Sequence, residues 1–277
     1  MLTKYSANPN DVKRYSTNEL REEFLVDDLF EPSKIKVAYS HIDRAVVLGI
    51  APTSEPLVIQ DWINNKSFGT DFFLQRRELG LACLAGSVKV TVDAQTYLLG
   101  ELDVLYVGVG SKDIEIARVS GEGMVYGLSA PAHKSLPTRV VTQQEARVVE
   151  LGSLETSNQR VINQYLHPDV IETCQLCLGI THLAPGSVWN TMPAHTHERR
   201  MEAYLYFNIK PEQTVFHMMG EPTETRHIVV RDKQLVLSPS WSIHSGCGTQ
   251  NYSFVWGMLG ENQTFDDMDF IPMDTLA

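Results

Sequence analysis

The sequence lacks any long hydrophobic run. Its 277 residues are 43% hydrophobic, but each apolar stretch ends after a few residues at a charge, a glycine or a proline. A helix that crosses a bilayer needs about 20 apolar residues. The first nine residues carry no apolar run behind Lys4, so they do not resemble a secretory signal. We therefore expect a soluble, cytoplasmic protein with no membrane partner.

Cysteine is also scarce. The chain has four cysteines, which are Cys83, Cys174, Cys177 and Cys247. Four unevenly spaced cysteines are too few for a disulfide framework, which agrees with a reducing compartment. Cys174 and Cys177 form one CxxC pair, but the sequence predicts a strand over residues 173–180, where positions three apart face opposite sides. We therefore expect neither a metal site nor a redox site at this pair.

Positive charge is in deficit. Lysine and arginine total 23 against 34 aspartate and glutamate residues, for a net charge of -11. Because binding to phosphate backbones requires a basic surface and no basic stripe is visible, we expect no nucleic-acid partner. The overall field also repels a small anion. If the substrate is anionic, arginines or a metal cation must reverse the sign of the field at the site.

Helical periodicity is rare, and short β-rich runs alternate with turn residues in both halves of the chain. The clearest expected strands are residues 86–93, 104–109, 202–207 and 215–219. Helices are expected only at residues 17–28 and 161–170. This pattern predicts an all-β protein of two tandem antiparallel sandwich or barrel domains. A linker expected near residues 130–150 divides them into domains 1–140 and 141–277, of which only the second carries a histidine cluster.

The segment around His195-Thr196-His197 carries the chemistry. Pro193 disfavours a helix here, and on an extended chain His195 and His197 point to the same side. Glu202 follows after a short turn at the start of the next strand, and His244 comes about 40 residues later. Three imidazoles and one carboxylate in this pattern predict a metal site at His195, His197, Glu202 and His244.

These residues also carry a resemblance. His195-x-His197-x4-Glu202 and Pro239-x-Trp241-x2-His244 resemble the two metal motifs of the cupin superfamily. Longer segments resemble the 5-keto-4-deoxyuronate isomerase family within it, and these are residues 23–26, 39–44, 76–80, 190–202, 216–220, 224–228, 238–246 and 260–269. The resemblance covers nearly the whole chain.

The resemblance implies a bicupin, with two cupin-type domains and a metal-free N-terminal one. It further implies a homo-oligomer, usually a hexamer, with zinc as the cofactor at one ion per chain or another divalent metal in its place. The implied activity is an aldose–ketose isomerisation of pectin breakdown, which converts the small uronate-derived substrate 4-deoxy-L-threo-5-hexosulose uronate to 3-deoxy-D-glycero-2,5-hexodiulosonate. A divalent cation suits this chemistry because it polarises a carbonyl and the neighbouring hydroxyl.

The remaining roles are open at this stage. Glu198 and Tyr204 are the candidate catalytic bases, and strand parity predicts that Tyr204 and Tyr206 face inward with Glu202. The candidate binders of the substrate carboxylate are Arg199, Arg200 and Arg226. His217 and His227 are equally compatible with a core position and with proton transfer. The choice between an enediol route and a hydride shift is also open.

Three other functions fit the same ligands. A different cupin reaction is the first, either another sugar isomerase or an iron-dependent dioxygenase. A non-catalytic sugar-binding cupin is the second, although no DNA-binding appendage is visible and no ligand is missing. A protein whose metal serves only the fold is the third. Four protein ligands on tetrahedral zinc are typical of structural sites, so an isomerase requires an expanded shell with room for substrate.

Overall fold

A computed structural model describes residues 1–261 and 264–277, which are mainly β-strands. The chain forms two compact units that are not contiguous in sequence. Unit 1 consists of residues 1–3, 28–146 and 165–177, and unit 2 consists of residues 4–27, 147–164 and 178–277. None of the helices in the described ranges is long and apolar enough to cross a membrane.

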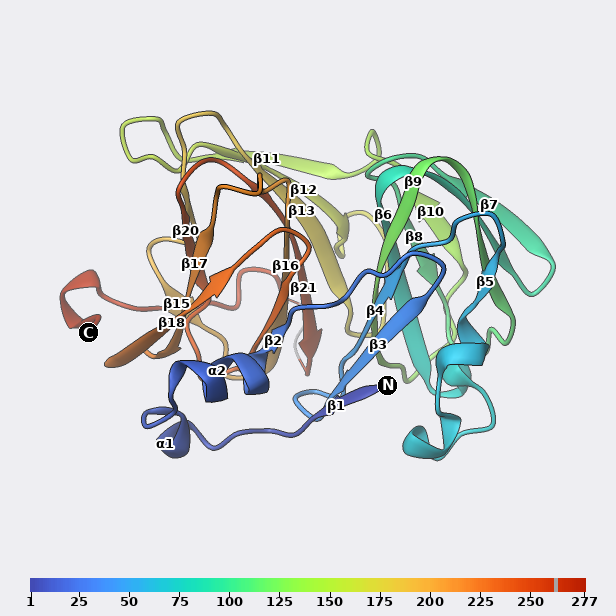
Figure 1. The fold of residues 1–277 in the computed structure, drawn as a ribbon, viewed down its shortest axis with the longest axis horizontal. Helices are drawn as coiled ribbons and strands as arrows, with labels where there is room; N and C mark the ends of the chain where they lie inside the picture. The colour runs from blue at the N-terminus through green and yellow to red at the C-terminus, as the bar shows by residue number, and fades with distance from the viewer. Residues whose placement is uncertain (262–263) are drawn as a thin grey trace. The chain divides into compact units, whose positions relative to one another are not determined.

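Unit 1 is built around a nine-stranded sheet (Figure 1). The strands of its main path, in spatial order, are β1 (Leu2–Lys4), β3 (Ile35–Ser40), β4 (Val46–Ile50), β9 (Ile114–Pro131), β6 (Arg77–Val92), β8 (Val104–Val107) and β10 (Arg139–Val141). Two short strands join from the side, β5 (Leu57–Val58) on β9 and β7 (Gln95–Leu99) on β6. The expected strands at residues 86–93 and 104–109 are confirmed as parts of β6 and β8.

The alternation of side chains along β6 explains the core of unit 1. Val88, Val90 and Val92 are buried while Lys89 between them is exposed, as expected for a strand with one face on the core. Burying a valine, leucine or isoleucine side chain contributes about 1.5–3 kcal/mol. The same core includes Ile35, Leu48, Ile50, Phe73, Leu79, Leu81, Leu105, Val107, Ile114, Ile116 and Val125.

Unit 2 contains a seven-stranded and a four-stranded sheet (Figure 1). The larger sheet consists of β11 (Arg147–Leu151), β12 (Arg160–Leu166), β13 (Cys177–Leu183), β21 (Ser253–Gly260), β16 (Arg200–Phe207), β19 (Leu235–Ser238) and β2 (Leu25–Val26). The smaller consists of β14 (Trp189–Asn190), β20 (Ser245–Gly248), β17 (Val215–Glu221) and β18 (Glu224–Val230), and β15 (His195–Thr196) pairs separately with β22 (Asp269–Phe270). The two sheets face each other at β16 and β17, where the rings of Tyr204 and Tyr206 lie 5.6 and 5.8 Å from the ring of His217 and the Tyr206 hydroxyl lies 2.8 Å from its Nδ1.

Helices are short. They are α1 (Pro9–Val12), α2 (Thr17–Phe24) and the 3₁₀ turns η1 (Ile59–Trp62), η2 (Asn65–Phe68), η3 (Phe73–Gln75) and η4 (Met273–Thr275). A capping box between Ser16 and Glu19 starts α2. The expected helix over residues 17–28 is too long, because Leu25 and Val26 pair with β19 and leave the helix at Phe24.

The expected helix over residues 161–170 is wrong. This segment forms strand β12 instead, which pairs residue by residue with β11, and the strand ends at Leu166 before Pro168. Its run of buried residues fits a central strand as well as a helix, and periodicity alone does not separate the two. The expected strand over residues 173–180 begins only at Cys177, since Cys174 lies in the preceding bend.

The expected linker near residues 130–150 contains strand β10 and most of β11, and one of the points where the chain passes from unit 1 to unit 2 lies after Ala146. All four cysteines are free. The family resemblance over residues 260–269 includes Asn262 and Gln263, which lie outside the described residues. The strands form several sheets and make the structure mostly β, as expected for a cupin-like fold.

Candidate metal centre

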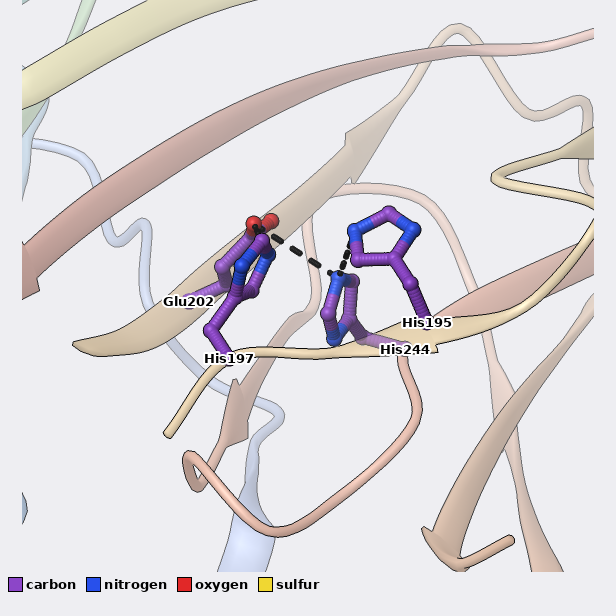
Figure 2. Close-up of side chains that lie close together, drawn as sticks. All are labelled: His195, His197, Glu202 and His244. Carbon is purple, nitrogen blue, oxygen red and sulfur yellow. Dashed lines mark hydrogen bonds and ion pairs between the residues drawn. The ribbon is translucent and has the colours of Figure 1, made fainter. Parts of the chain in front are cut away.

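The four predicted ligands lie together in unit 2 (Figure 2). His195 lies on β15, Glu202 lies on β16, and a turn at residues 198–199 returns the chain between them. His197 directly follows β15, and His244 directly precedes β20. One donor atom from each side chain lies within 4.8 Å of all the others, and all four residues are buried. The predicted convergence of His195, His197, Glu202 and His244 is confirmed.

Three distances between the donor atoms are close to those expected around a single cation. Nε2 of His195 lies 2.9 Å from Nε2 of His244. Oε1 of Glu202 lies 2.8 Å from Nε2 of His197 and 3.5 Å from Nε2 of His244. Ligand atoms about 2.1 Å from one ion are about 3.0 Å apart at a right angle and about 3.4 Å apart at the tetrahedral angle. The donor set and its spacing therefore suit a divalent metal.

Backbone carbonyls orient two of the imidazoles. Nδ1 of His197 lies 2.5 Å from the carbonyl oxygen of Asp267, and Nδ1 of His244 lies 3.3 Å from that of Ser242. An Nδ1–H group that donates to a carbonyl leaves Nε2 unprotonated, with its lone pair available to a metal. Both Nε2 atoms face the cluster.

Arg200 fixes the loop that carries Asp267. Its guanidinium donates to the carbonyl oxygens of Thr264, Phe265 and Asp267, at 2.6, 2.9 and 3.2 Å. The side chain is only 1% exposed. Arg200 is one of the predicted substrate ligands, but these contacts direct its guanidinium to the backbone that holds His197.

The electrostatics keep the ligands in their metal-binding forms. Burial, followed by the neighbouring His244, lowers the pKa of His195 to about 3. Burial also lowers the pKa of His244. For Glu202, burial acts to raise the pKa, but His244, His197 and His195 outweigh it and hold the pKa below the usual range. A neutral His195 and His244 beside an ionised Glu202 are what a cation requires.

The cluster opens onto a cavity of about 410 Å³ in unit 2. On successive strands of the seven-stranded sheet, every second residue lines the cavity, because alternate side chains of a strand point to the same face. These residues are Arg147, Val149 and Leu151 on β11, Arg160, Ile162 and Gln164 on β12, Thr181 on β13, Phe254, Trp256 and Met258 on β21, and Arg200, Glu202 and Tyr204 on β16. Most of the wall between the metal ligands and β12 is therefore aromatic or aliphatic.

Tyr204 lines this cavity and is buried, so it faces inward as predicted. Its hydroxyl lies 3.4 Å from the Thr191 hydroxyl. Burial, reinforced by the charge of Glu202, raises the pKa of Tyr204 well above its ordinary value. The phenol therefore stays protonated and can donate a hydrogen bond to a ligand oxygen. Tyr206 also faces inward, where it contacts His217.

The other predicted site residues lie elsewhere in the described part of the chain. Glu198 and Arg199 are exposed in the turn before β16, and neither lines the cavity. Arg226 on β18 donates to the backbone carbonyls of Lys13 and Tyr15 and is also outside the cavity lining. This geometry gives no support to the roles expected for these three residues.

Two other histidines stand apart from the ligand cluster. His217 is fully buried, and burial lowers its pKa to about 3. His227 is exposed and packs against the Phe216 ring.

Sequence reasoning missed three charged residues that line the cavity. Arg147 lies in the expected linker, Arg160 directly precedes the expected helix over residues 161–170, and Asp266 lies in the loop held by Arg200. Asp266 lies within the resemblance over residues 260–269, but no local motif surrounds the two arginines. Only the period-two alternation of residues 147–151 and 160–164 could have indicated that they share a face with apolar residues.

Three comparisons place the chain among known proteins. The model of the KduI/IolB family matches residues 61–273. A 4-deoxy-L-threo-5-hexosulose-uronate ketol-isomerase from Lachnoclostridium phytofermentans is 52% identical over 97% of each chain, and one from Pectobacterium carotovorum subsp. carotovorum is 49% identical over 99% of each. The crystal structure of an IolB-like protein from Salmonella typhimurium LT2 superposes with a TM-score of 0.73, at 16% identity, over 90% of this chain and 97% of that one. That structural likeness concerns the fold.

Proposed function

The chain belongs to the KduI/IolB family, and from that premise we propose that it is a metal-dependent ketol-isomerase of 4-deoxy-L-threo-5-hexosulose uronate. The product is 3-deoxy-D-glycero-2,5-hexodiulosonate, and the reaction belongs to the breakdown of pectin and related polyuronates. The observation that carries the chemistry is the buried cluster of His195, His197, Glu202 and His244 in the wall of a cavity. The substrate is proposed from relatives that carry this name and are about half identical over nearly their whole length.

The reaction moves one hydrogen from C2 to C1 and one proton from the C2 hydroxyl to the C1 oxygen, so that no atoms are gained or lost. A divalent cation held by the four ligands supplies polarisation of the carbonyl and of the neighbouring hydroxyl. The Tyr204 hydroxyl, next to Glu202 in the cavity wall, donates a hydrogen bond to a substrate oxygen. Phe254 and Trp256 are buried in the wall of the same cavity and limit the access of water to the reacting end.

We propose zinc as the metal, at one ion per chain. Imidazole and carboxylate donors are within the range of zinc, which has no redox chemistry to compete with isomerisation. The same donors also bind iron or manganese, so the metal has to be identified by elemental analysis. An iron-dependent dioxygenase is the alternative that uses the same four residues, and activity without oxygen would exclude it.

We also propose that the two units are tandem cupin-type domains and that the protein is a cytoplasmic homo-oligomer, a hexamer by family resemblance. The face-to-face sheets of unit 2 support the first point. Four free cysteines support a reducing compartment. Exposed apolar side chains on and after the edge strand β11, which are Val148 and Leu154, support association of subunits.

The test is direct. The purified protein is incubated with the unsaturated-uronate product of a pectin lyase, and NMR follows loss of the aldehyde hydrate signal and appearance of the ketone. We expect turnover that persists without oxygen and stops on addition of a chelator. Running the reaction in D2O adds a second result, because deuterium at C1 indicates proton exchange and its absence indicates a hydride shift. A metal-loaded protein that leaves the aldehyde unchanged would contradict the proposal.

A further inference from the structure

The cavity wall of unit 2 is cationic at the end formed by β11 and β12. One face of this strand pair supplies Arg147, Arg160 and Gln164 to the lining, with Val149 and Ile162 between them. The register pairs Arg147 with Gln164, while Arg160 lies at the opposite end of the pair, across from Leu151. The two arginines are therefore separate groups and not a single clamp.

The three arginines of the lining differ in how their guanidinium groups are engaged. Arg200 is fully buried and donates to three backbone carbonyls. Arg147 donates to Oε1 of Gln164 at 2.6 Å. Arg160 is only partly buried, and the hydrogen bond that the described residues give it runs from Nη1 to the carbonyl oxygen of Asn158, at 2.9 Å. Of the three, Arg160 has the most donor capacity left for a ligand.

Arg160 lines the same cavity as Tyr204 and Glu202. Burial lowers its pKa, and the nearby Tyr204 and Tyr252 hydroxyls act against that shift. Tyr204 is a close neighbour of Glu202 and lines the same cavity. Within residues 1–261 and 264–277 Arg160 forms no ion pair with a carboxylate, and a guanidinium that has lost water without gaining such a partner gains most from an anionic ligand.

The charge of the lining is opposite to that of the whole chain. The protein carries a net charge of -11, but its cavity is lined by three arginines against two carboxylates, Glu202 and Asp266. Glu202 belongs to the metal cluster. A concave site with low-dielectric walls concentrates such a local field, so the cavity attracts an anion that the surface repels.

We propose that Arg160 binds the carboxylate of the substrate. The sugar then lies along the wall of Phe254 and Trp256, with its aldehyde end at Glu202 and its carboxylate end at β12. Arg160 thereby selects acid sugars over neutral ones and sets the direction in which the substrate enters. This inference rests on the proposed isomerase function, and it assigns the orientation of the substrate within the same cavity.

The experiment compares two substrates and four proteins. The substrates are the uronate and its C6 amide, which is similar in shape but uncharged. The proteins are the wild type, Arg160→Gln, Arg160→Lys and the control Arg118→Gln, whose arginine is exposed on β9 in unit 1. Each protein is also checked for metal content and melting temperature, so that loss of fold is separated from loss of binding.

We expect the wild type to prefer the uronate, and Arg160→Gln to lose about 10- to 100-fold in kcat/KM on the uronate, mainly through KM. The same variant should change little on the amide. Arg160→Lys keeps the charge but loses the two-point geometry, so it should recover only part of the loss. Arg118→Gln should match the wild type on both substrates.

Two outcomes would overturn the inference while leaving the proposed function intact. One is a wild type that turns over the uronate and the amide equally well, a result that needs no variant to fold. The other is an active wild type together with a metal-loaded Arg160→Gln or Arg160→Lys protein whose KM for the uronate is unchanged. A wild type that is inactive on the uronate would instead overturn the proposed function, and this inference with it.

Discussion

Nε2 of His197 lies 2.8 Å from Oε1 of Glu202, although five positions of sequence and a turn separate the two residues. Strand β16 begins at Arg200 and antiparallel pairing holds it between β19 and β21, with Glu202 opposite Ser238 and Met258. Glu202 is therefore placed by a central strand, while His197 is placed by a loop. Glu202 therefore lies on a strand that is paired on both sides, and the predictions begin with it.

Replacing Glu202 with glutamine should leave a folded protein that binds metal poorly. The amide has nearly the same shape but no negative charge, so it cannot balance a cation held by three neutral imidazoles. We expect metal content well below one ion per chain and a loss of kcat/KM above about 100-fold. Elemental analysis and the NMR assay measure both. Glu212→Gln, at an exposed loop position, is the matched control, and full metal loading of Glu202→Gln would contradict the assignment.

Removing the metal should abolish turnover at a moderate cost to stability. A ligand that binds only the folded state stabilises it by about 2.7 kcal/mol when present at 100 times its dissociation constant. We expect dialysis against a chelator to remove activity and lower the melting temperature, and stoichiometric zinc to restore both. If the chelated protein unfolds completely, or if activity survives, the metal does not have the role proposed for it.

Replacing Arg200 with methionine should weaken metal binding from a distance. The buried guanidinium donates to the Asp267 carbonyl that also receives Nδ1–H of His197. Loss of its bonds leaves carbonyls unpaired, which should cost about 2–4 kcal/mol in the free energy of unfolding. Metal affinity should fall about 10- to 100-fold. Urea unfolding and a competitive metal titration measure the two effects, and an unchanged affinity would show that the loop does not orient His197.

Glu78 should be essential to the stability of unit 1. It is fully buried on β6, and its carboxylate accepts hydrogen bonds from the backbone N–H groups of Cys174, Gln175 and Leu176 and from the Tyr106 hydroxyl. Glu78→Ala leaves four buried donors unpaired, so we expect a loss of about 3–5 kcal/mol in urea unfolding.

The variant Glu78→Gln retains one acceptor oxygen at the same position. It should lie between Glu78→Ala and the wild type in unfolding free energy. Metal content, measured at a temperature where the protein is folded, should stay at the wild-type level for both variants. Equal stability of all three proteins would contradict this account of residues 174–176.

Cys83 should be the least reactive thiol in the folded protein. Burial raises its pKa to about 12, so almost no thiolate exists at pH 8. A disulfide reagent should react with Cys247, which is partly exposed, well before Cys83. Mass spectrometry of the labelled peptides identifies the order, and rapid labelling of Cys83 in the absence of denaturant would contradict it.

The raised pKa of Cys83 also predicts that the stability of the protein depends on pH. The unfolded thiol ionises near pH 8.5, while folded Cys83 stays protonated until about pH 12. Between these values the folded state binds more protons, so the free energy of unfolding falls as pH rises. Cys83→Ala should make that fall less steep. Urea unfolding at pH 8 and pH 10 measures the difference between the two proteins.

The amino-acid sequence alone was enough to predict that His195, His197 and Glu202 gather at one place. On an extended chain, residues two apart share a side, and Pro193 excludes a helix, so His195 and His197 had to point together. Glu202 was within reach because a short turn joins consecutive strands. These relations are local, and local geometry follows from residue type and spacing. The expected strands at residues 202–207 and 215–219 were confirmed for the same reason.

The surroundings of the candidate metal site follow from long-range packing and not from the sequence near the four residues. Strand β12 was expected as a helix because its buried run satisfies either element, and pairing with β11 settled the choice. The order β12-β13-β21-β16 brings Arg160, Trp256 and Tyr204 to one cavity from distant parts of the chain. The sequence offered Arg200 and Arg226 as candidate binders of the substrate carboxylate, but in the structure both guanidinium groups donate to backbone carbonyls. Such long-range pairing depends on the packing of the whole sheet, so it cannot be predicted from the spacing of residues within a short segment.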